Sequence, residues 1–213
     1  MKEAFQKQYD EKSAPWNYDG FDKDIQKFLE ENKVFSVWNY SELDKDFDEV
    51  FKKLNPRSSV IDLGCGNGAQ AHHIEKMGFD VTGTDVVNAL EYKLNNFILD
   101  DALQSKLTKK YDVIVDRGLI HNLFHLKETR HKYFEMIGNI IHDDSYIILK
   151  VLSPYEARFN PSTHSGPYRF NEKQLEGFYS GFGFKCVELK DTLFYTNLQP
   201  HLRGYLGIYK KEL

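Results

Sequence analysis

Three glycines alternate in the segment 60–69, whose sequence is VIDLGCGNGA. Glycine adopts backbone dihedrals that other residues avoid, and without a Cβ it lets a ligand lie directly against the main chain. The glycines follow an apolar, β-branched run at 59–63 and precede a helical stretch that begins at Ala69. A glycine-rich turn from a strand into a helix is typical of nucleotide-binding sites. The sequence therefore predicts a nucleoside ligand at Gly64 to Gly68.

Two classes of ligand fit such a turn. A dinucleotide requires the pattern G-x-G-x-x-G/A, which Gly64, Gly66 and Ala69 satisfy, and its pyrophosphate would lie at the helix N-terminus. S-adenosylmethionine has no phosphate but carries an ammonium, a carboxylate and a sulfonium. Asp62 favours the second ligand, because a carboxylate two residues before the first glycine repels a pyrophosphate and attracts a cationic methionine moiety.

A second acidic residue, Asp85, closes the next apolar run, 21 residues after Gly64. A carboxylate at that place accepts hydrogen bonds from both ribose hydroxyls of an adenosine ligand, in NAD and in S-adenosylmethionine alike. The alternative is that Asp85 only caps a following helix. Asp85 thus supports an adenosine ligand without choosing between the two classes.

Acidic residues also follow the third and fourth apolar runs. Asp101 and Ala102 would approach the adenine, although Asp100 stands beside them and a solvated turn is the alternative. Asp116 would line the ligand edge, with a surface ion pair to Arg117 as the alternative.

Short apolar runs and helical stretches alternate along the chain, which predicts a mostly parallel sheet with helices on both faces and ligands at the carboxyl ends of the strands. Irregular sequence before the last strand allows it to pair antiparallel. The expected strands cover residues 59–63, 79–84, 96–99, 111–116, 145–152, 182–189 and 204–209, and the expected helices 69–77, 87–93, 129–141 and 171–180. Asn171 and Gln174 form the capping box of the last helix.

A single domain is expected, with a helical N-terminal cover at 1–55 and a catalytic core at 56–213. The cover would contain helices at 22–31 and 42–54. These helices would pack on the sheet or cap the mouth of the site.

The glycine motif combined with the spaced acidic residues resembles the class I S-adenosylmethionine-dependent methyltransferases, from Val60 to Tyr209. The stretch DRGLIHNL and the PW near the start look like small-molecule methyltransferases of the thiopurine and tellurite-resistance type. The resemblance implies a Rossmann-like, three-layer αβα fold with a mostly parallel seven-stranded sheet and an antiparallel last strand. It also implies a set of cofactor-binding residues, namely Asp62, Gly64, Cys65, Gly66, Asn67, Gly68, Asp85, Val86, Asp101, Ala102 and Asp116.

The reaction implied is methyl transfer to a small molecule by in-line displacement. A thiolate acceptor needs no base, whereas a neutral hydroxyl or amine needs one, and His121 after the fourth strand is the candidate together with Asp116. A capping or packing histidine is the alternative. Further residues are candidates for substrate contact: Trp16, Arg117, His121, Tyr155 and Arg158. His121 and His125 lack the glutamate and third ligand of a metal site, so no metal is expected.

The charge balance and the cysteine count of the sequence limit which kinds of partner we expect. The 28 basic and 32 acidic residues give a net charge of −4, which disfavours nucleic acid as the partner. Enzymes that methylate amino groups of nucleic acids carry an Asn-Pro-Pro-Tyr motif after the fourth strand, where this chain has Asp116-Arg117-Gly118. This difference disfavours a DNA- or glutamine-methylating enzyme. Two cysteines, no signal sequence and no apolar span predict a cytoplasmic protein without a membrane segment. Two other functions remain open at this point: an NAD(P)-dependent oxidoreductase and a non-catalytic, methyltransferase-like binding protein.

Overall fold

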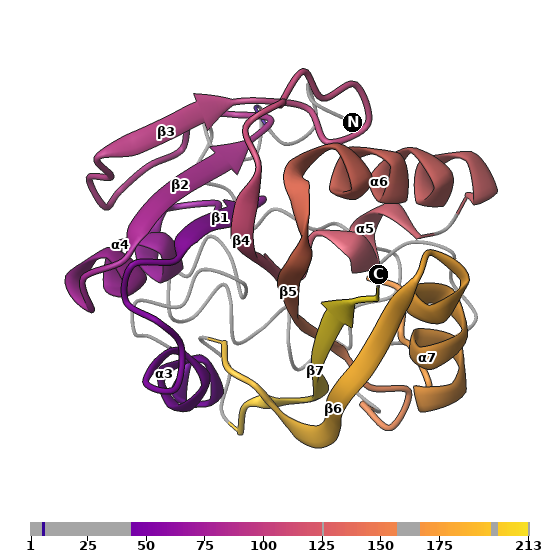
Figure 1. Cartoon of the computed structure of the whole chain (residues 1–213). Helices are drawn as coiled ribbons and strands as arrows, with labels where there is room; N and C mark the ends of the chain where they lie inside the picture. The colour runs from indigo at the N-terminus through magenta and orange to yellow at the C-terminus, as the bar shows by residue number, and fades with distance from the viewer. Residues whose placement is uncertain (1–5, 7–43, 125, 157–166, 197–199, 213) are drawn as a thin grey trace.

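The computed structural model describes residues 6, 44–124, 126–156, 167–196 and 200–212. Seven strands form one sheet in the order β3-β2-β1-β4-β5-β7-β6, with helices on both faces (Figure 1). The strands are β1 (Ser59–Leu63), β2 (Asp80–Asp85), β3 (Asn96–Leu99), β4 (Tyr111–Arg117), β5 (Ile141–Leu152), β6 (Phe184–Phe194) and β7 (Leu202–Lys211). The helices are α3 (Lys45–Phe51), α4 (Ala69–Lys76), α5 (Ile120–Leu123), α6 (Lys127–Ile140) and α7 (Glu172–Gly181).

The first five strands run parallel, so their carboxyl ends share one edge of the sheet. β7 pairs antiparallel with both β5 and β6 and lies between them. The predicted αβα fold with a mostly parallel seven-stranded sheet and an antiparallel last strand is therefore confirmed.

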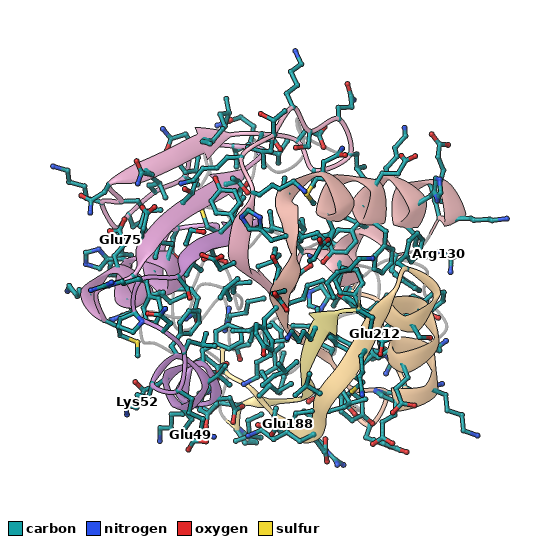
Figure 2. All side chains as sticks on the ribbon, viewed as in Figure 1. Glu49, Lys52, Glu75, Arg130, Glu188 and Glu212 are labelled. Carbon is teal, nitrogen blue, oxygen red and sulfur yellow. The ribbon has the colours of Figure 1, made fainter. Side chains whose placement is uncertain are left out.

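Alternate side chains of the strands build two separate cores. On one face, Ile61 and Ile114 pack with residues of α5, α6 and α7. On the other face, Val60 and Val113 pack with residues of α3 and α4, including Phe47. Side chains fill the layers between sheet and helices, and labelled charged residues such as Glu49 of α3 and Glu75 of α4 lie at the periphery (Figure 2). The period-two alternation of each strand thus decides which helical layer a side chain meets.

One predicted helix, at 87–93, is wrong: the segment forms bends and irregular backbone. The backbone N–H groups of Glu91 and Tyr92 both donate to the Asn67 carbonyl, at 2.9 and 3.1 Å. These amides are therefore unavailable for the i→i−4 bonds of a helix, although Ala89, Leu90 and Glu91 have good helix propensity.

Other differences concern element lengths. β5 begins four residues earlier than expected and β6 extends five residues further, to Phe194. α3 lies inside the expected helix at 42–54, whereas the expected helix at 22–31 falls outside the described residues. The capping box of α7 is confirmed: Asn171 accepts from the Gln174 amide, and the Gln174 side chain accepts from the Asn171 amide.

Candidate functional site

The glycine loop connects β1 to α4 at the carboxyl edge of the sheet. Gly64, Gly66 and Gly68 have φ angles of 66°, 57° and 83°, a region that L side chains rarely adopt. A Cβ on Gly68 would also lie 2.7 Å from a methyl carbon of Leu90. The loop therefore needs glycine for its backbone conformation and, at Gly68, for space.

Asp85, at the end of β2, holds this loop. Its Oδ2 accepts from the Gly66 amide at 2.9 Å, and its Oδ1 accepts from the Val87 amide at 3.2 Å. Burial raises the pKa of Asp85 and the backbone amides of Gly66, Val87 and Val86 lower it, with the net shift upward. Each carboxylate oxygen has two lone pairs, so both oxygens of Asp85 can still accept a hydrogen bond from the ribose hydroxyls of an adenosine ligand. No helix follows Asp85, so it does not act as a helix cap.

Asp62, in β1, has a buried oxygen with no hydrogen-bond partner among the described residues. The residue is only 2% exposed, and the orphaned atom is Oδ2. Burial raises the pKa of Asp62 to about 7; Arg117 lowers it, and the charges of Asp116 and Asp85 raise it further. A buried, unpartnered carboxylate oxygen is costly unless a cation or a donor meets it. Asp62 therefore fits the ammonium group of a methionine moiety.

The three carboxylates Asp62, Asp85 and Asp116 belong to three neighbouring strands, β1, β2 and β4. Their charges act on one another, which makes this edge of the sheet electronegative. Burial, together with Asp62 and Asp85, also raises the pKa of the Cys65 thiol above its ordinary value. Because the thiolate is the nucleophilic form, Cys65 serves the loop as a small buried side chain and not as a nucleophile.

Asp116 is fully buried, and both its oxygens are engaged by the protein. Oδ1 accepts from the Leu119 amide at 2.7 Å, and Oδ2 accepts from the Ile120 amide at 3.0 Å and from the Tyr133 hydroxyl at 2.8 Å. The ion pair with Arg117, considered from the sequence, does not form: the Arg117 Nε lies 3.9 Å from Asp44 and its guanidinium stacks on Phe194. Asp116 thus organises the turn after β4, and its contact with a ligand stays a prediction.

His121, the candidate base, lies in α5 and is 2% exposed. Its ring stacks on Phe194 with centroids 5.7 Å apart, and the same Phe194 ring carries the Arg117 guanidinium at 4.8 Å. The structure thus brings His121 and Arg117 together on an aromatic residue of β6. Phe194 was not predicted as a site residue, because the expected strand ended at residue 189.

The other candidates are spread along the same edge. Asn67 accepts from the Ala69 amide through its side chain, and Val86 is half-buried beside Asp85. Asp101 accepts from the Leu103 amide at 2.9 Å and, like Ala102, remains half-buried in the turn after β3. Tyr155, after β5, is 63% exposed. Trp16, His125 and Arg158 fall outside the described residues.

Solved structures of several S-adenosylmethionine-dependent methyltransferases share this fold. An S-adenosylmethionine-dependent methyltransferase from Methanosarcina mazei aligns with a TM-score of 0.64 and 16% identity, over 81% of this chain and 99% of that one. A 1,6-didemethyltoxoflavin N1-methyltransferase from Burkholderia thailandensis aligns with a TM-score of 0.59 and 16% identity, over 79% and 84%. A TehB-like methyltransferase from Corynebacterium glutamicum aligns with a TM-score of 0.61 and 14% identity, over 89% and 95%. No curated protein sequence matches.

The chain belongs to the methyltransferase domain family, which it matches over residues 35–189. It is an S-adenosylmethionine-dependent methyltransferase, and the oxidoreductase alternative is excluded by this membership. Within the described part of the chain, no helix is long and apolar enough to cross a bilayer.

Proposed function

We propose that this enzyme methylates a small-molecule acceptor by in-line displacement. The observation that carries the cofactor side of the proposal is the buried, unpartnered Oδ2 of Asp62 next to the glycine loop. Asp62 would hold the ammonium group, the loop from Gly64 to Gly68 the methionine end, and Asp85 the ribose. Asp101 and Ala102 would lie at the adenine.

Support for a small acceptor comes from charge and from similar structures. The net charge of −4 provides no general attraction for a polyanion. One similar structure contains bound 1,6-didemethyltoxoflavin, and two others are of a magnesium protoporphyrin IX methyltransferase, so this fold accommodates small acceptors. The acceptor would approach from the end of β4, where Arg117 and His121 lie on Phe194.

The bound cofactor supplies an electrophilic methyl group on a sulfonium. The acceptor's nucleophilic atom would form the new bond to carbon while the carbon–sulfur bond breaks and sulfur keeps the electron pair. For a neutral hydroxyl or amine acceptor, His121 would take the released proton. For a thiolate, alignment and exclusion of water suffice, because opposite charges are neutralised along the reaction.

Calorimetry with S-adenosylhomocysteine, in parallel with NAD, tests the cofactor assignment. Saturable binding of the first and no binding of the second are expected. A mass-spectrometric screen with S-adenosylmethionine then compares small thiols, amines and phenols with an RNA and a peptide mixture. Methylation confined to the RNA or the peptides would contradict the small-molecule proposal.

A further inference from the structure

The turn between β4 and α5 contacts both the glycine loop and His121. Gly118 has a φ of 95°, and the next residue, Leu119, packs against the glycine loop: a Cβ on Gly64 would lie 3.2 Å from the Leu119 Cβ. On the other side, a Cβ on Gly118 would lie 2.9 Å from the Nε2 atom of His121. The position of this turn therefore sets the distance between the cofactor loop and His121.

Asp116 holds the turn from inside the protein. Its carboxylate accepts from the amides of Leu119 and Ile120, two consecutive backbone donors of the turn and of the first residue of α5. Charged acceptors make stronger hydrogen bonds than neutral ones. The turn is accordingly tightest when Asp116 is ionised.

Tyr133 supplies the third hydrogen bond to Asp116, and it comes from a different element. It lies in α6, is fully buried among apolar residues, and donates from its hydroxyl to Asp116 Oδ2 at 2.8 Å. A phenylalanine fills the same space in an apolar core, so packing alone does not require the hydroxyl. The hydroxyl also interacts with that of Tyr179, but the group to which it donates is the Asp116 carboxylate.

We propose that Tyr133 is a positioning residue for methyl transfer: through Asp116 it fixes the β4–α5 turn, and thereby Leu119 against the cofactor loop and His121 on the acceptor side. The importance for catalysis rests on the proposed function, whereas the effect on the turn does not. Tyr133 itself is fully buried in the protein.

The ionisation of Asp116 connects this hydrogen bond to pH. Burial raises the pKa of Asp116 to about 6, and the hydrogen bonds from Tyr133 and from the turn amides lower it. Within the described part of the chain, the charge of Asp116 also acts on Asp62 in β1 and on Tyr179 in α7, while the Nε of Arg117 lies 3.9 Å from Asp44. Loss of the Tyr133 hydroxyl therefore moves the pKa of Asp116 upward, towards neutral pH.

Tyr133→Phe tests the proposal, with Tyr209→Phe as the matched control. Tyr209 is also buried in the same core, but its hydroxyl has no hydrogen-bond partner in the described part of the chain. Carbon-13 NMR of the aspartate carboxyl groups, with Asp116 assigned by its loss in Asp116→Asn, gives the titration midpoint. In Tyr133→Phe we expect this midpoint to rise by about 0.5–1 pH unit, and in Tyr209→Phe to stay in place.

Hydrogen exchange supplies a second readout that needs no acceptor. At pH 7 the protection of the Leu119 and Ile120 amides should fall about three- to tenfold in Tyr133→Phe, and it should be unchanged in Tyr209→Phe. An unchanged midpoint and unchanged protection in Tyr133→Phe, or equal changes in both variants, would overturn the proposal while leaving the methylation proposal intact.

Turnover then tests the catalytic consequence, using the acceptor identified by the screen. We expect kcat of Tyr133→Phe to fall at least threefold and the acid limb of its pH profile to move upward with Asp116, while the affinity for S-adenosylhomocysteine changes by less than twofold. An unchanged kcat and pH profile would overturn the catalytic part.

If Tyr133→Phe does not fold, 3-fluorotyrosine at position 133 is the second variant. Its hydroxyl is a stronger donor and should lower the Asp116 midpoint, and no shift would overturn the proposal.

Discussion

A buried carboxylate oxygen that no donor meets destabilises the free protein in its ionised form, and Oδ2 of Asp62 is such an atom among the described residues. Its pKa of about 7 lies above the ordinary 3.8, so the stability associated with its protonated form is complete below pH 4 and is lost as the pH rises through 7. A cationic ligand reverses this loss, because it favours the ionised form. Binding of a cationic ligand at Asp62 is thus coupled to the release of a proton from its carboxyl group.

The first prediction concerns that linkage. The affinity for S-adenosylhomocysteine should weaken as the pH falls below 7, up to about tenfold per pH unit, because a proton must leave Asp62 on binding. Calorimetry between pH 5.5 and 8.5, in buffers with different ionisation enthalpies, measures the affinity and the proton released. In Asp62→Asn this proton release should vanish. An affinity independent of pH in the wild type would contradict the role given to Asp62.

A second prediction concerns Asp85. Asp85→Ala should cost about 1.5–3 kcal/mol of cofactor binding free energy, because it removes a charged acceptor and also frees the Gly66 amide. Asp80→Ala is the control, since Asp80 lies in the same strand but is exposed and pairs only with a surface lysine, Lys109, among the ion pairs of the described residues. Calorimetry with S-adenosylhomocysteine compares the two, and equal affinities would remove Asp85 from the site.

At the scale of elements, the glycine loop offers a third prediction. Gly68→Ala combines a positive φ with a Cβ only 2.7 Å from Leu90 and 3.0 Å from the Tyr92 carbonyl oxygen. Gly78→Ala has a similar φ of 98° but meets nothing within 4 Å, so it measures the backbone strain alone. Thermal unfolding should show that both variants lose about 1–2 kcal/mol from strain. Only Gly68→Ala should in addition lose cofactor affinity; equal binding in both variants would argue against close packing of the loop.

Elements with a strong local signal were predictable from the sequence, and those decided by distant partners were not. The apolar β1 run, the glycine loop and the Asn171 capping box each carry their own determinants. The conformation of the segment 87–93 instead depends on a distant partner, because two of its amides donate to the carbonyl of Asn67. The position of Asp85 followed from a strand end and that of Asp62 from its place just before the glycine loop, whereas the pairing of Tyr133 with Asp116 joins two elements and leaves no pattern beyond an apolar helix face.

On the scale of the whole molecule, an ionic cluster ties α3 to the sheet. Lys150 in β5 is fully buried and lies 2.5 Å from Asp44, the N-cap of α3, and within hydrogen-bond reach of Asp46. Burial lowers the pKa of Lys150, and the carboxylates partly restore it. Burial alone would raise the pKa of Asp46, but the hydrogen bonds from Lys150 and Thr192 bring it below its ordinary value. Sequence alone revealed only a lysine interrupting an apolar strand.

The fourth prediction follows from this cluster. Lys150→Met should lower the free energy of unfolding by about 3–5 kcal/mol, because it removes the cation 2.5 Å from the buried Asp44 and leaves only Arg117, at 3.9 Å, to balance that charge. Urea unfolding measures the loss. Lys150→Met combined with Asp44→Asn should recover much of the stability, since no unpaired charge then remains at Asp44. If the double variant were no more stable than the single one, the loss would come from packing and not from charge.

The strand order has a consequence for synthesis on the ribosome. In the sheet of the described residues, β6 is an edge strand that pairs with β7 alone, and β7 is made after it. While translation has not reached residues 202–211, the side of β5 that will receive β7 stays uncovered and β6 has no place to dock. A nascent chain therefore exposes the unpaired, aggregation-prone edge of β5 until β7 emerges from the ribosome. A chaperone would be most useful during this interval.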